Sequence, residues 1–583
     1  MKRLGLLISL IMITSLLAAC APAATPSPTE APPVAAATPT SLPKPTPTPP
    51  PPPEPVVLRM AIGSEPPTLD PNLGEDTTSI DCDKQLFVGL LKINGKTSEL
   101  ENDLATDWEV SADGTIYTFK MRDDVYWVRY DPDTEEIEKV RLVNAHDIEY
   151  SVRRAVMPET ASPYAYVAYA IKNAEAINNA DPGGYDIETL GVKALDDYTI
   201  QFELEFAASY FPSITSLWTV RPVPKEPIEE FGDEWTEPGN IMTNGPMVLT
   251  EWTHDAHLNF KKNPYYHFAD EIEIDEIDVS IVSEDATRMA MYENDEVDFV
   301  GVPTDDIDRV KADAVLGKEY YSAPYPGTYI LYFRTTKPPM DDVHVRRALS
   351  YALNRQSLID NVTKGGQMPA RAFAPPGIFG NVAEDPEVGI TFDLEKAKAE
   401  LAEAGYPDGE GFPTLLYMYN TWGGFNEKLA QAVGQMWKDN LNIDVTFESM
   451  EWKVYLGVIK AGAPDEEVGH VFRYAWLADY PDQNNWVHEV HSPTQGANRS
   501  KLDPETDPLA KELDELTIAA GREQDPEKRK EMYKRVEQIL TYEICAFAPL
   551  YHYTTNVVVK PYLHRDYPLM CGINWSEWTM DPH

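Results

Sequence analysis

The sequence has 583 residues, more than one ordinary domain holds, so we expect two or more lobes. Lys plus Arg total 49 and Asp plus Glu total 95, which gives a formal net charge of −46. Such an acidic surface repels phosphate backbones, so we expect no nucleic-acid partner. Hydrophobic residues make up 43%, which excludes wholesale disorder, and four cysteines in this length exclude a fold built on disulfides.

The first residues have the layout of a secretory signal. Lys2 and Arg3 precede an apolar run over 4–19, which is too short and too interrupted for a membrane-spanning helix. The run ends in Leu-Ala-Ala directly before Cys20, and this ending resembles a bacterial lipobox. The resemblance implies a signal peptide over 1–19, cleaved before Cys20, and lipid on that cysteine. The alternative is an ordinary signal peptide with an incidental cysteine.

A linker follows over 20–55. It consists almost entirely of Ala, Pro, Thr and Ser, with prolines throughout 49–53, so it cannot build a core. Proline fixes φ and removes hydrogen-bond donors, which predicts an extended polyproline II tether with a reach on the order of 100 Å. No later segment has 18 uninterrupted apolar residues, so we expect membrane contact through the lipid anchor only.

Strand-like and helical patterns alternate through 56–583, which indicates an α/β fold. Apolar and β-branched runs predict strands over the ranges 56–62, 115–121, 199–204 and 443–447. Apolar residues at helical spacing predict helices over the ranges 343–362, 394–404, 425–440 and 525–541.

Motifs of catalysis and metal binding do not occur in the sequence. It has no GxSxG, no P-loop, no HExxH and no GxGxxG after a strand. His488 and His491 have metal-like spacing, but the helix they need would end at Ser492-Pro493. His254 and His257 fit a polar turn between strands. We therefore expect no catalytic residue, no metal and no cofactor.

If Cys20 carries lipid, three cysteines remain, and at most one internal disulfide is possible. Cys545 and Cys571 are the nearer pair in sequence, but the sequence does not decide whether they are joined.

Short motifs along 56–583 resemble those of a known family. They are Ser64-Glu65-Pro66-Pro67-Thr68-Leu69-Asp70-Pro71, Leu104-Ala105-Thr106-Asp107-Trp108-Glu109, Asp113-Gly114-Thr115-Ile116-Tyr117-Thr118-Phe119, Asn244-Gly245-Pro246-Met247 with Asn263-Pro264-Tyr265-Tyr266, Val343-His344-Val345-Arg346-Arg347-Ala348-Leu349-Ser350-Tyr351-Ala352-Leu353, and Trp476-Leu477-Ala478-Asp479-Tyr480. In this order they resemble the peptide/nickel (family 5) class of solute-binding proteins of ABC importers. Within that class the chain is most similar to the oligopeptide-binding branch.

The resemblance implies a two-lobed α/β clamshell of the periplasmic-binding-protein type (type II, cluster C), which closes over its ligand about a hinge. Lobe I is expected to be discontinuous, with residues 56–324 and 549–583, and lobe II to comprise residues 325–548. Two departures stand out. An insert over 128–142 replaces a short family loop and predicts a surface hairpin around Asp131-Pro132-Asp133. The tail over 563–583, with two tryptophans, matches no motif.

The resemblance also places a ligand site. Asp479 is the expected anchor for a peptide ammonium, because burying an ammonium costs several kcal/mol unless a carboxylate meets it. Asp482 is the fallback carboxylate. The alternative role of Asp479 is to cap a turn or helix before Pro481.

Further positions match pocket residues of the oligopeptide branch. Arg473 is expected to pair with a carboxylate of the ligand or near Asp479. Trp476 and Trp452 are expected to wall side-chain pockets, unless they are plain core. Glu75 is expected to take a basic ligand side chain, unless it is a solvated loop charge. Tyr164 is expected to contact the ligand near its middle.

Two positions depart from the family pattern. A histidine and an arginine that help to meet the ligand carboxylate appear here as Asn426 and Ile459, and Asn426 is the seventh residue that we expect to bind the ligand. This departure weakens the expectation of fixed capture at the carboxyl end of short peptides, and it leaves longer peptides or another solute open.

The function implied is that of a monomeric, lipid-anchored receptor outside the cytoplasmic membrane. It captures oligopeptides and delivers them to the permease subunits of an ABC transporter, and its outer face is either a periplasm or a single-membrane exterior. The alternatives are the same fold carrying another solute, such as an oligosaccharide or a metal chelate, an extracellular hydrolase, or a purely structural envelope lipoprotein.

Overall fold

The computed structural model describes residues 54–421, 424–460, 462–565 and 573–583. Residues 55–583 form one compact unit. The predicted signal peptide, Cys20, all but the end of the predicted linker, and Cys571 therefore lie outside the described residues. Cys82 and Cys545 are buried free thiols. Across the described ranges, no helix combines the length and the apolar character that crossing a bilayer would need.

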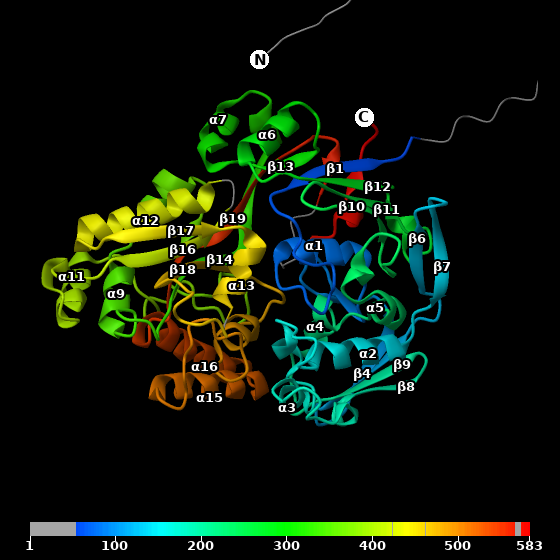
Figure 1. The fold of residues 1–583 in the computed structure, drawn as a ribbon, viewed down its shortest axis with the longest axis horizontal. Helices are drawn as coiled ribbons and strands as arrows, with labels where there is room; N and C mark the ends of the chain where they lie inside the picture. The colour runs from blue at the N-terminus through cyan, green and yellow to red at the C-terminus, as the bar shows by residue number, and fades with distance from the viewer. Residues whose placement is uncertain (1–53, 422–423, 461, 566–572) are drawn as a thin grey trace, which may run out of the picture. The chain divides into compact units, whose positions relative to one another are not determined.

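Lobe I is built on two sheets, on the right of Figure 1. The first has the order β1 (Val57–Ile62), β12 (Glu276–Ile281), β11 (His257–Lys262), β10 (Met247–Thr253). The second has the order β4 (Ala105–Val110), β5 (Ile116–Met121), β9 (Thr199–Glu203), β8 (Val192–Asp196). Its longer helices are α1 (Thr77–Leu86), α2 (Ala145–Val156), α5 (Lys225–Phe231) and α6 (Asp285–Glu293).

Local sequence explains these elements. In β5 the side chains of Tyr117, Phe119 and Met121 are buried and alternate with more exposed residues, as the two-residue period of a half-buried strand requires. Helix α2 begins with a capping box, in which the Asn144 side chain and the Asp147 side chain each accept a backbone N–H of the other's turn.

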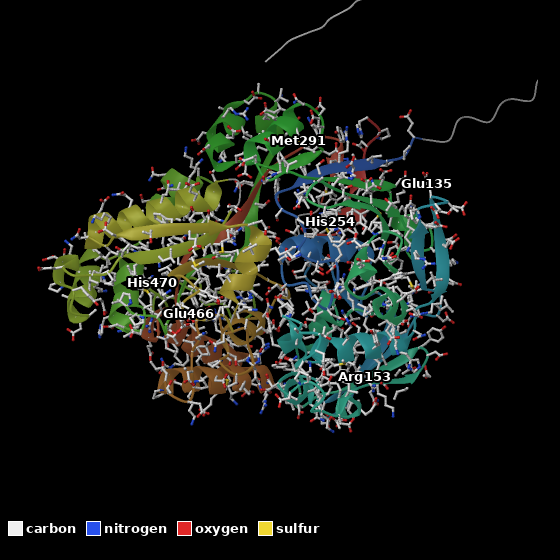
Figure 2. All side chains as sticks on the ribbon, in the orientation of Figure 1. Glu135, Arg153, His254, Met291, Glu466 and His470 are labelled. Carbon is white, nitrogen blue, oxygen red and sulfur yellow. The ribbon has the colours of Figure 1, made fainter. Side chains whose placement is uncertain are left out.

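The insert forms the predicted hairpin. Strands β6 (Tyr126–Asp131) and β7 (Glu136–Leu142) pair antiparallel, and Glu135, labelled in Figure 2, has a φ of 58° at the turn. His254, also labelled there, lies in the predicted turn between β10 and β11.

Lobe II contains a mixed sheet, on the left of Figure 1. Its order is β13 (Phe299–Gly301), β19 (Phe547–Val559), β14 (Tyr320–Phe333), β18 (Val471–Leu477), β16 (Leu415–Asn420), β17 (Val445–Met450), and β15 (Met368–Pro369) also pairs with β19. The flanking helices are α9 (Val343–Tyr351), α11 (Leu394–Glu403), α12 (Phe425–Leu441), α13 (Trp452–Ile459), α15 (Pro508–Arg522) and α16 (Pro526–Gln538).

The two faces of this sheet pack against different cores. In β14, Tyr329, Leu331 and Phe333 join the core that contains residues of α9, α11 and α12. The intervening Ile330 and Tyr332 join a core that continues into lobe I. The alternation along one strand therefore connects the two lobes through packed side chains.

Strands β14 and β19 are the longest strands of the sheet and lie side by side, with Tyr320 opposite Val558 and Tyr332 opposite Phe547. The predicted lobe boundaries, at 324/325 and 548/549, fall inside these two strands. The exact boundaries stay a prediction, and the pairing supports two neighbouring chain crossings as the hinge.

Most predicted elements are confirmed, and two need correction. The range 343–362 is not one helix, because α9 ends at Tyr351 and α10 (Arg355–Leu358) begins anew. The Asn354 side chain accepts the backbone N–H of Ser357, so an N-cap replaces the helical continuation. The strand expected at 443–447 begins at Val445, since Asn442 ends α12 with a φ of 58°.

The C-terminal tail, unassigned from sequence, packs against α1. Gln85 donates from Nε2 to the carbonyl of Ile573 at 2.8 Å and accepts the N–H of Ser576 at 3.1 Å. Trp575 and Trp578 are each only 2% exposed. Trp575 and Trp578 are thus part of the core that contains residues of lobe I.

Candidate ligand-binding cleft

Two predicted site residues, Trp452 and Asp479, lie at one edge of the lobe II sheet together with Asn420. Strand β16 runs parallel to both β17 and β18, so the carboxyl ends of these strands meet. Asn420 ends β16, Trp452 follows β17, and Asp479 follows β18. In open α/β sheets this edge is where ligands bind, because loops there converge without blocking the strands.

Lobe I contributes the loop before α1 and the first turns of that helix. Asp76 caps α1 by accepting the N–H groups of Thr78 and Ser79. Glu75 precedes it, and Ile80 lies one turn further on. The Trp452 indole of lobe II donates to Asp76 at 3.3 Å, so a tryptophan of one lobe reaches the helix start of the other.

These two edges enclose a cavity of about 210 Å³, here called the central cavity. Six of the seven predicted ligand-binding residues line it, namely Glu75, Tyr164, Trp452, Arg473, Trp476 and Asp479. Asp76, Thr77, Ile80, Tyr325, Leu456, Tyr474, Ala475, Leu477 and Tyr553 complete the lining. The fold thus brings together predicted residues that are up to 404 positions apart in the sequence, as Glu75 and Asp479 are.

Asp479 is 5% exposed and faces this cavity. Its Oδ2 accepts the hydroxyl of Tyr164 at 2.9 Å and the side-chain amide of Asn485 at 2.8 Å. Within the described part of the chain, Oδ1 accepts no hydrogen bond. One carboxylate oxygen is thus held in place by donors from both lobes, and the carboxyl group lines the cavity.

Burial raises the pKa of Asp479 to about 6, and the hydrogen bonds from Asn485 and Tyr164 limit that rise. The positive charge of Lys84 also lowers the pKa. A cation in the cavity would lower it further, since an opposite charge favours the ionised carboxylate. The site is therefore prepared for a cationic group.

Asn485, missed by the sequence reasoning, positions the anchor. Its Oδ1 accepts the backbone N–H of Asp479 and the indole N–H of Trp476, while its Nδ2 donates to both Asp479 and Glu489. Burial raises the pKa of Glu489 to about 8, with the charge of Asp479 adding to the rise. The Asn485 amide thus bridges the carboxyl groups of Asp479 and Glu489, whose negative charges repel each other.

A second missed residue, Arg499, meets Glu75. The guanidinium donates to Glu75 at 2.9 Å and lies over the Tyr474 ring at 4.6 Å. Glu75 keeps a raised pKa, because burial outweighs the charge of Arg499. Its predicted role as partner of a basic ligand side chain stays a prediction, and in this structure Arg499 occupies that role.

The aromatic and cationic walls lie close together. Trp476 stacks on Tyr164 with ring centroids 6.0 Å apart and planes 7° apart. The Arg473 guanidinium donates to Asn420 at 3.2 Å and lies 5.8 Å from the Trp452 ring. Flat rings and a fixed guanidinium give the cavity rigid walls that tolerate different side chains.

The remaining predicted positions lie outside the central cavity. Asn426 is buried, and its side-chain amide donates to Asn420. Asn420 lines a neighbouring cavity, so Asn426 contacts a lining residue but does not itself line that cavity. Ile459 is fully buried in α13. Asp482, the fallback anchor, forms a two-pronged ion pair with Arg529 at 2.7 and 2.8 Å, so its charge is already met.

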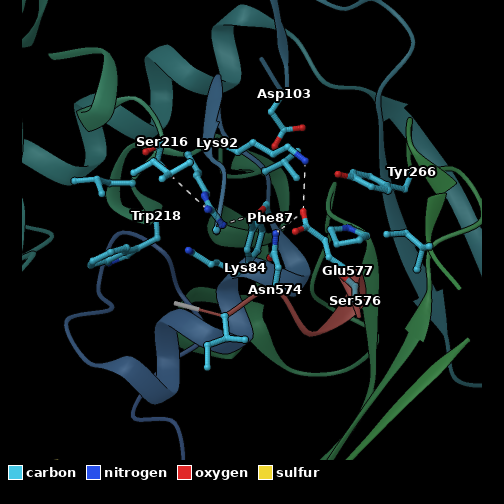
Figure 3. Close-up of a pocket in the computed structure, with 18 of the residues that line it drawn as sticks. Lys84, Phe87, Lys92, Asp103, Ser216, Trp218, Tyr266, Asn574, Ser576 and Glu577 are labelled. Atoms are coloured by element: carbon cyan, nitrogen blue, oxygen red, sulfur yellow. Dashed lines mark hydrogen bonds and ion pairs between the residues drawn. The ribbon is translucent and has the colours of Figure 1, made fainter. Parts of the chain in front are cut away.

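Two further cavities adjoin the central one. One of about 340 Å³, here called the side cavity, shares Thr77 and Trp452 with it. The other, of about 80 Å³ and drawn in Figure 3, shares Asp479 and is lined by the charged side chains of Lys84, Lys92 and Glu577. Lys92 and Glu577 form an ion pair there at 3.4 Å. Its charged side chains and small volume suit a few water molecules.

Among the residues that the structure describes, no group of three or more His, Cys, Asp or Glu side chains could hold a metal ion. His488 and His491 are both buried, and burial lowers their pKa values to about 4 and about 3.

The fold and the cleft define a two-lobed α/β binding protein with its site between the lobes. Residues 99–498 match the model of the bacterial extracellular solute-binding proteins, family 5 (middle region). The chain belongs to this family of solute-binding proteins.

Named relatives match most of the chain. It is 34% identical to the oligopeptide-binding protein OppA of Bacillus subtilis, over 86% of this chain and 88% of that one. It is 32% identical to the periplasmic oligopeptide-binding protein OppA of Salmonella typhimurium, with the same coverage. It is also 30% identical to the probable deoxycholate-binding periplasmic protein YgiS of Escherichia coli, over 87% of this chain and 90% of that one.

Solved structures indicate which conformation the chain adopts. The murein tripeptide binding protein MppA of Escherichia coli, at 29% identity, matches with a TM-score of 0.80 over 91% of this chain and 99% of that one. Its unliganded open form matches with only 0.61, over 91% and 98%. Together with the contacts across the cleft, such as Tyr164 to Asp479 and Arg499 to Glu75, this difference indicates a closed arrangement.

We predict that Tyr164→Phe raises the pKa of Asp479 above its value of about 6, by roughly one unit, because the carboxylate loses a charge-assisted hydrogen bond. Carboxyl-detected NMR titration of the folded protein measures this pKa. Tyr169→Phe is the matched control, since Tyr169 donates its hydroxyl to Asn178 in another part of lobe I. An unchanged pKa in Tyr164→Phe would show that this bond does not hold the anchor.

Proposed function

We propose that the protein is a receptor that captures oligopeptides in the central cavity by their amino terminus and delivers them to an ABC importer. The observation that carries the proposal is the buried carboxylate of Asp479, whose Oδ2 is held by Tyr164 and Asn485 and which lines the central cavity. Every peptide presents the same ammonium whatever its side chains, so one acid serves many sequences.

The walls of the cavity support this proposal. Trp476, Trp452 and Tyr164 offer rigid apolar surface that needs no particular side chain. The names of the relatives in Bacillus subtilis and Salmonella typhimurium, both oligopeptide-binding proteins, point in the same direction. None of the described residues that line this cavity is a Ser, Cys, His or Lys, and we propose binding and not hydrolysis as its activity.

A second candidate is another solute in the same cleft, and the relative named as a probable deoxycholate-binding protein supports it. Deoxycholate carries a carboxylate, which Asp479 would repel. An oligosaccharide would lean on stacked aromatic rings and need no ammonium anchor. A peptide is therefore favoured over both by the charge of the anchor.

The proposal includes the location and the partners. Lipid on Cys20 anchors the mature monomer outside the cytoplasmic membrane, and the linker over 20–55 lets it reach the permease. Only the closed lobes contact the ligand from both sides, so the ligand shifts the balance toward the closed form by its differential affinity. The closed form is then what the permease recognises.

Replacing Asp479 by Ala is expected to cost about 2–5 kcal/mol of binding free energy for a free-amine peptide, since it leaves a buried ammonium without a counter-ion. That is a loss of roughly thirtyfold to several thousandfold in affinity, measurable by titration calorimetry. The same peptide with an acetylated amino terminus should bind the wild-type protein equally poorly.

The acetylated peptide is also the control for the variant. Asp479→Ala and the wild-type protein should bind it with nearly equal affinity, since the ammonium is already gone. If Asp479→Ala binds the free-amine peptide as well as the wild-type protein does, the amino terminus is not held there and the peptide proposal fails.

Peptide affinity is expected to fall as the pH drops below about 6. The unoccupied site has Asp479 at a pKa of about 6, and a bound ammonium favours the ionised form. Below that pKa a proton must leave before the ligand binds, so affinity falls by about tenfold per pH unit. Calorimetry between pH 4.5 and 7 checks this, and Asp479→Asn should flatten the dependence.

Replacing Cys20 by Ser is expected to abolish the lipid anchor, because the serine hydroxyl lacks the sulfur that carries the diacylglycerol. The wild-type protein should partition into the detergent phase of a cell extract and the variant into the aqueous phase. If the wild-type protein is found in the aqueous phase, the lipid anchor is removed from the proposal, and the proposed binding function is unaffected.

A further inference from the structure

The side cavity is a continuation of the ligand cleft. It has a volume of about 340 Å³, and both it and the central cavity are lined by Thr77 and Trp452. A peptide held by its amino terminus at Asp479 fills the central cavity first. Its later residues, or a long side chain, would then meet the side cavity.

The walls of the side cavity combine aromatic rings with acids. Trp452, Phe425 and Trp575 supply the rings, and Asp81 and Asp285 supply the carboxylates. Carboxylates next to flat aromatic surfaces are the usual surroundings of an ammonium or guanidinium, which gains both an ion pair and a cation–π contact.

One of the two acids is already neutralised within the protein. Arg288 donates to the carboxylate of Asp285, and it also donates to the backbone carbonyls of Val282 and Ser283. The charges of this pair cancel, so the lining has one excess negative charge, which belongs to Asp81.

Asp81 is held by the C-terminal tail. Its Oδ1 accepts the backbone N–H of Ile573 at 2.7 Å, which fixes the carboxyl group at the cavity wall. Burial raises its pKa to about 7, although the charges of Lys84 and Arg565 act in the opposite direction. An acid that is costly to ionise in the unoccupied cavity is one that a ligand cation would stabilise.

The same tail supplies the aromatic wall. Trp575 is 2% exposed, lies 6.3 Å from the Phe260 ring in an edge-on arrangement, and is followed by Ser576, whose N–H bonds to Gln85 of α1. The wall is therefore pre-formed by core packing, so little ordering is needed when a ligand enters.

We infer that the side cavity is a specificity pocket for a lysine or arginine side chain of the bound peptide, with Asp81 as its counter-ion and Trp575 and Trp452 as its walls. This inference rests on the proposed peptide-binding function. It assigns a ligand role to Asp81 and to the C-terminal tail.

The peptide carboxyl terminus does not suit this pocket. The guanidinium of Arg288 is occupied by Asp285 and by two carbonyls, and the remaining acid would repel a second carboxylate. A neutral side chain such as that of leucine would contact the rings but bring no positive charge to Asp81.

The test uses hexapeptides of alanine in which a lysine is placed at each of positions 2 to 6 in turn, and a second set with norleucine, which has a similar length and no charge. Affinities for the wild-type protein are measured by calorimetry at pH 8. At one or more positions the lysine peptide should bind at least about tenfold more tightly than the norleucine peptide.

The variant Asp81→Asn should abolish that lysine preference and leave affinity for the all-alanine peptide within about twofold. Asparagine keeps an oxygen that accepts the N–H of Ile573, and equal melting temperatures would show that the fold is kept. Glu109→Gln is the matched control, because it removes one negative charge from exposed strand β4 and should keep the preference.

The outcomes separate the two proposals. If the all-alanine peptide binds but lysine and norleucine peptides bind equally at every position, the specificity pocket is overturned and the peptide receptor stands. A preference retained in Asp81→Asn overturns the role of Asp81. If no peptide of either set binds, the proposed function fails, and this inference fails with it.

Discussion

The arrangement depends on one carboxylate that is buried next to empty space. Asp479 has lost most of its contact with water, and two neutral donors, Tyr164 and Asn485, compensate only part of that loss. Ionising such a group without a cation nearby is costly, and the raised pKa of Asp479 expresses this cost. The protein therefore keeps a site whose most stable state is one in which a cation is present.

The rest of the fold places this group and limits what can reach it. Parallel strands bring Asn420, Trp452 and Asp479 to one sheet edge, and the other lobe supplies Tyr164 and the start of α1. Because Tyr164 and Asp479 belong to different lobes, their hydrogen bond exists only when the lobes are together. Closure of the cleft therefore also sets the position of the Asp479 carboxylate, because the Oδ2 atom accepts this hydrogen bond from the other lobe.

Periodic patterns in the sequence predicted the elements, because such patterns are local, and the resemblance to the family supplied the expected site residues. Helix 394–404 follows from the spacing of its apolar residues, and the hairpin follows from an insert relative to the family with turn residues at its centre. The range 343–362 failed as one helix because the cap of Asn354 outweighs the apolar spacing there.

Other features had no local signal. Arg499, Asn485 and Asp81 matter because of the residues that they meet, and those residues lie in other elements of the chain. No pattern around Arg499 indicates Glu75, which is 424 positions away. Predicting such pairs requires the packed lobes.

The C-terminal tail and helix α1 both lie outside the range 99–498 that matches the family, whereas Asp479, Arg473, Trp476, Trp452 and Tyr164 lie inside it. In the proposed pocket, Asp81 and Trp575 therefore lie in other stretches of the chain than Asp479, Arg473 and Trp476, while Trp452 lines both cavities. Substitutions at Asp81 and Trp575 would then change which side chains are accepted, while the hydrogen bonds that hold Asp479 stay in place.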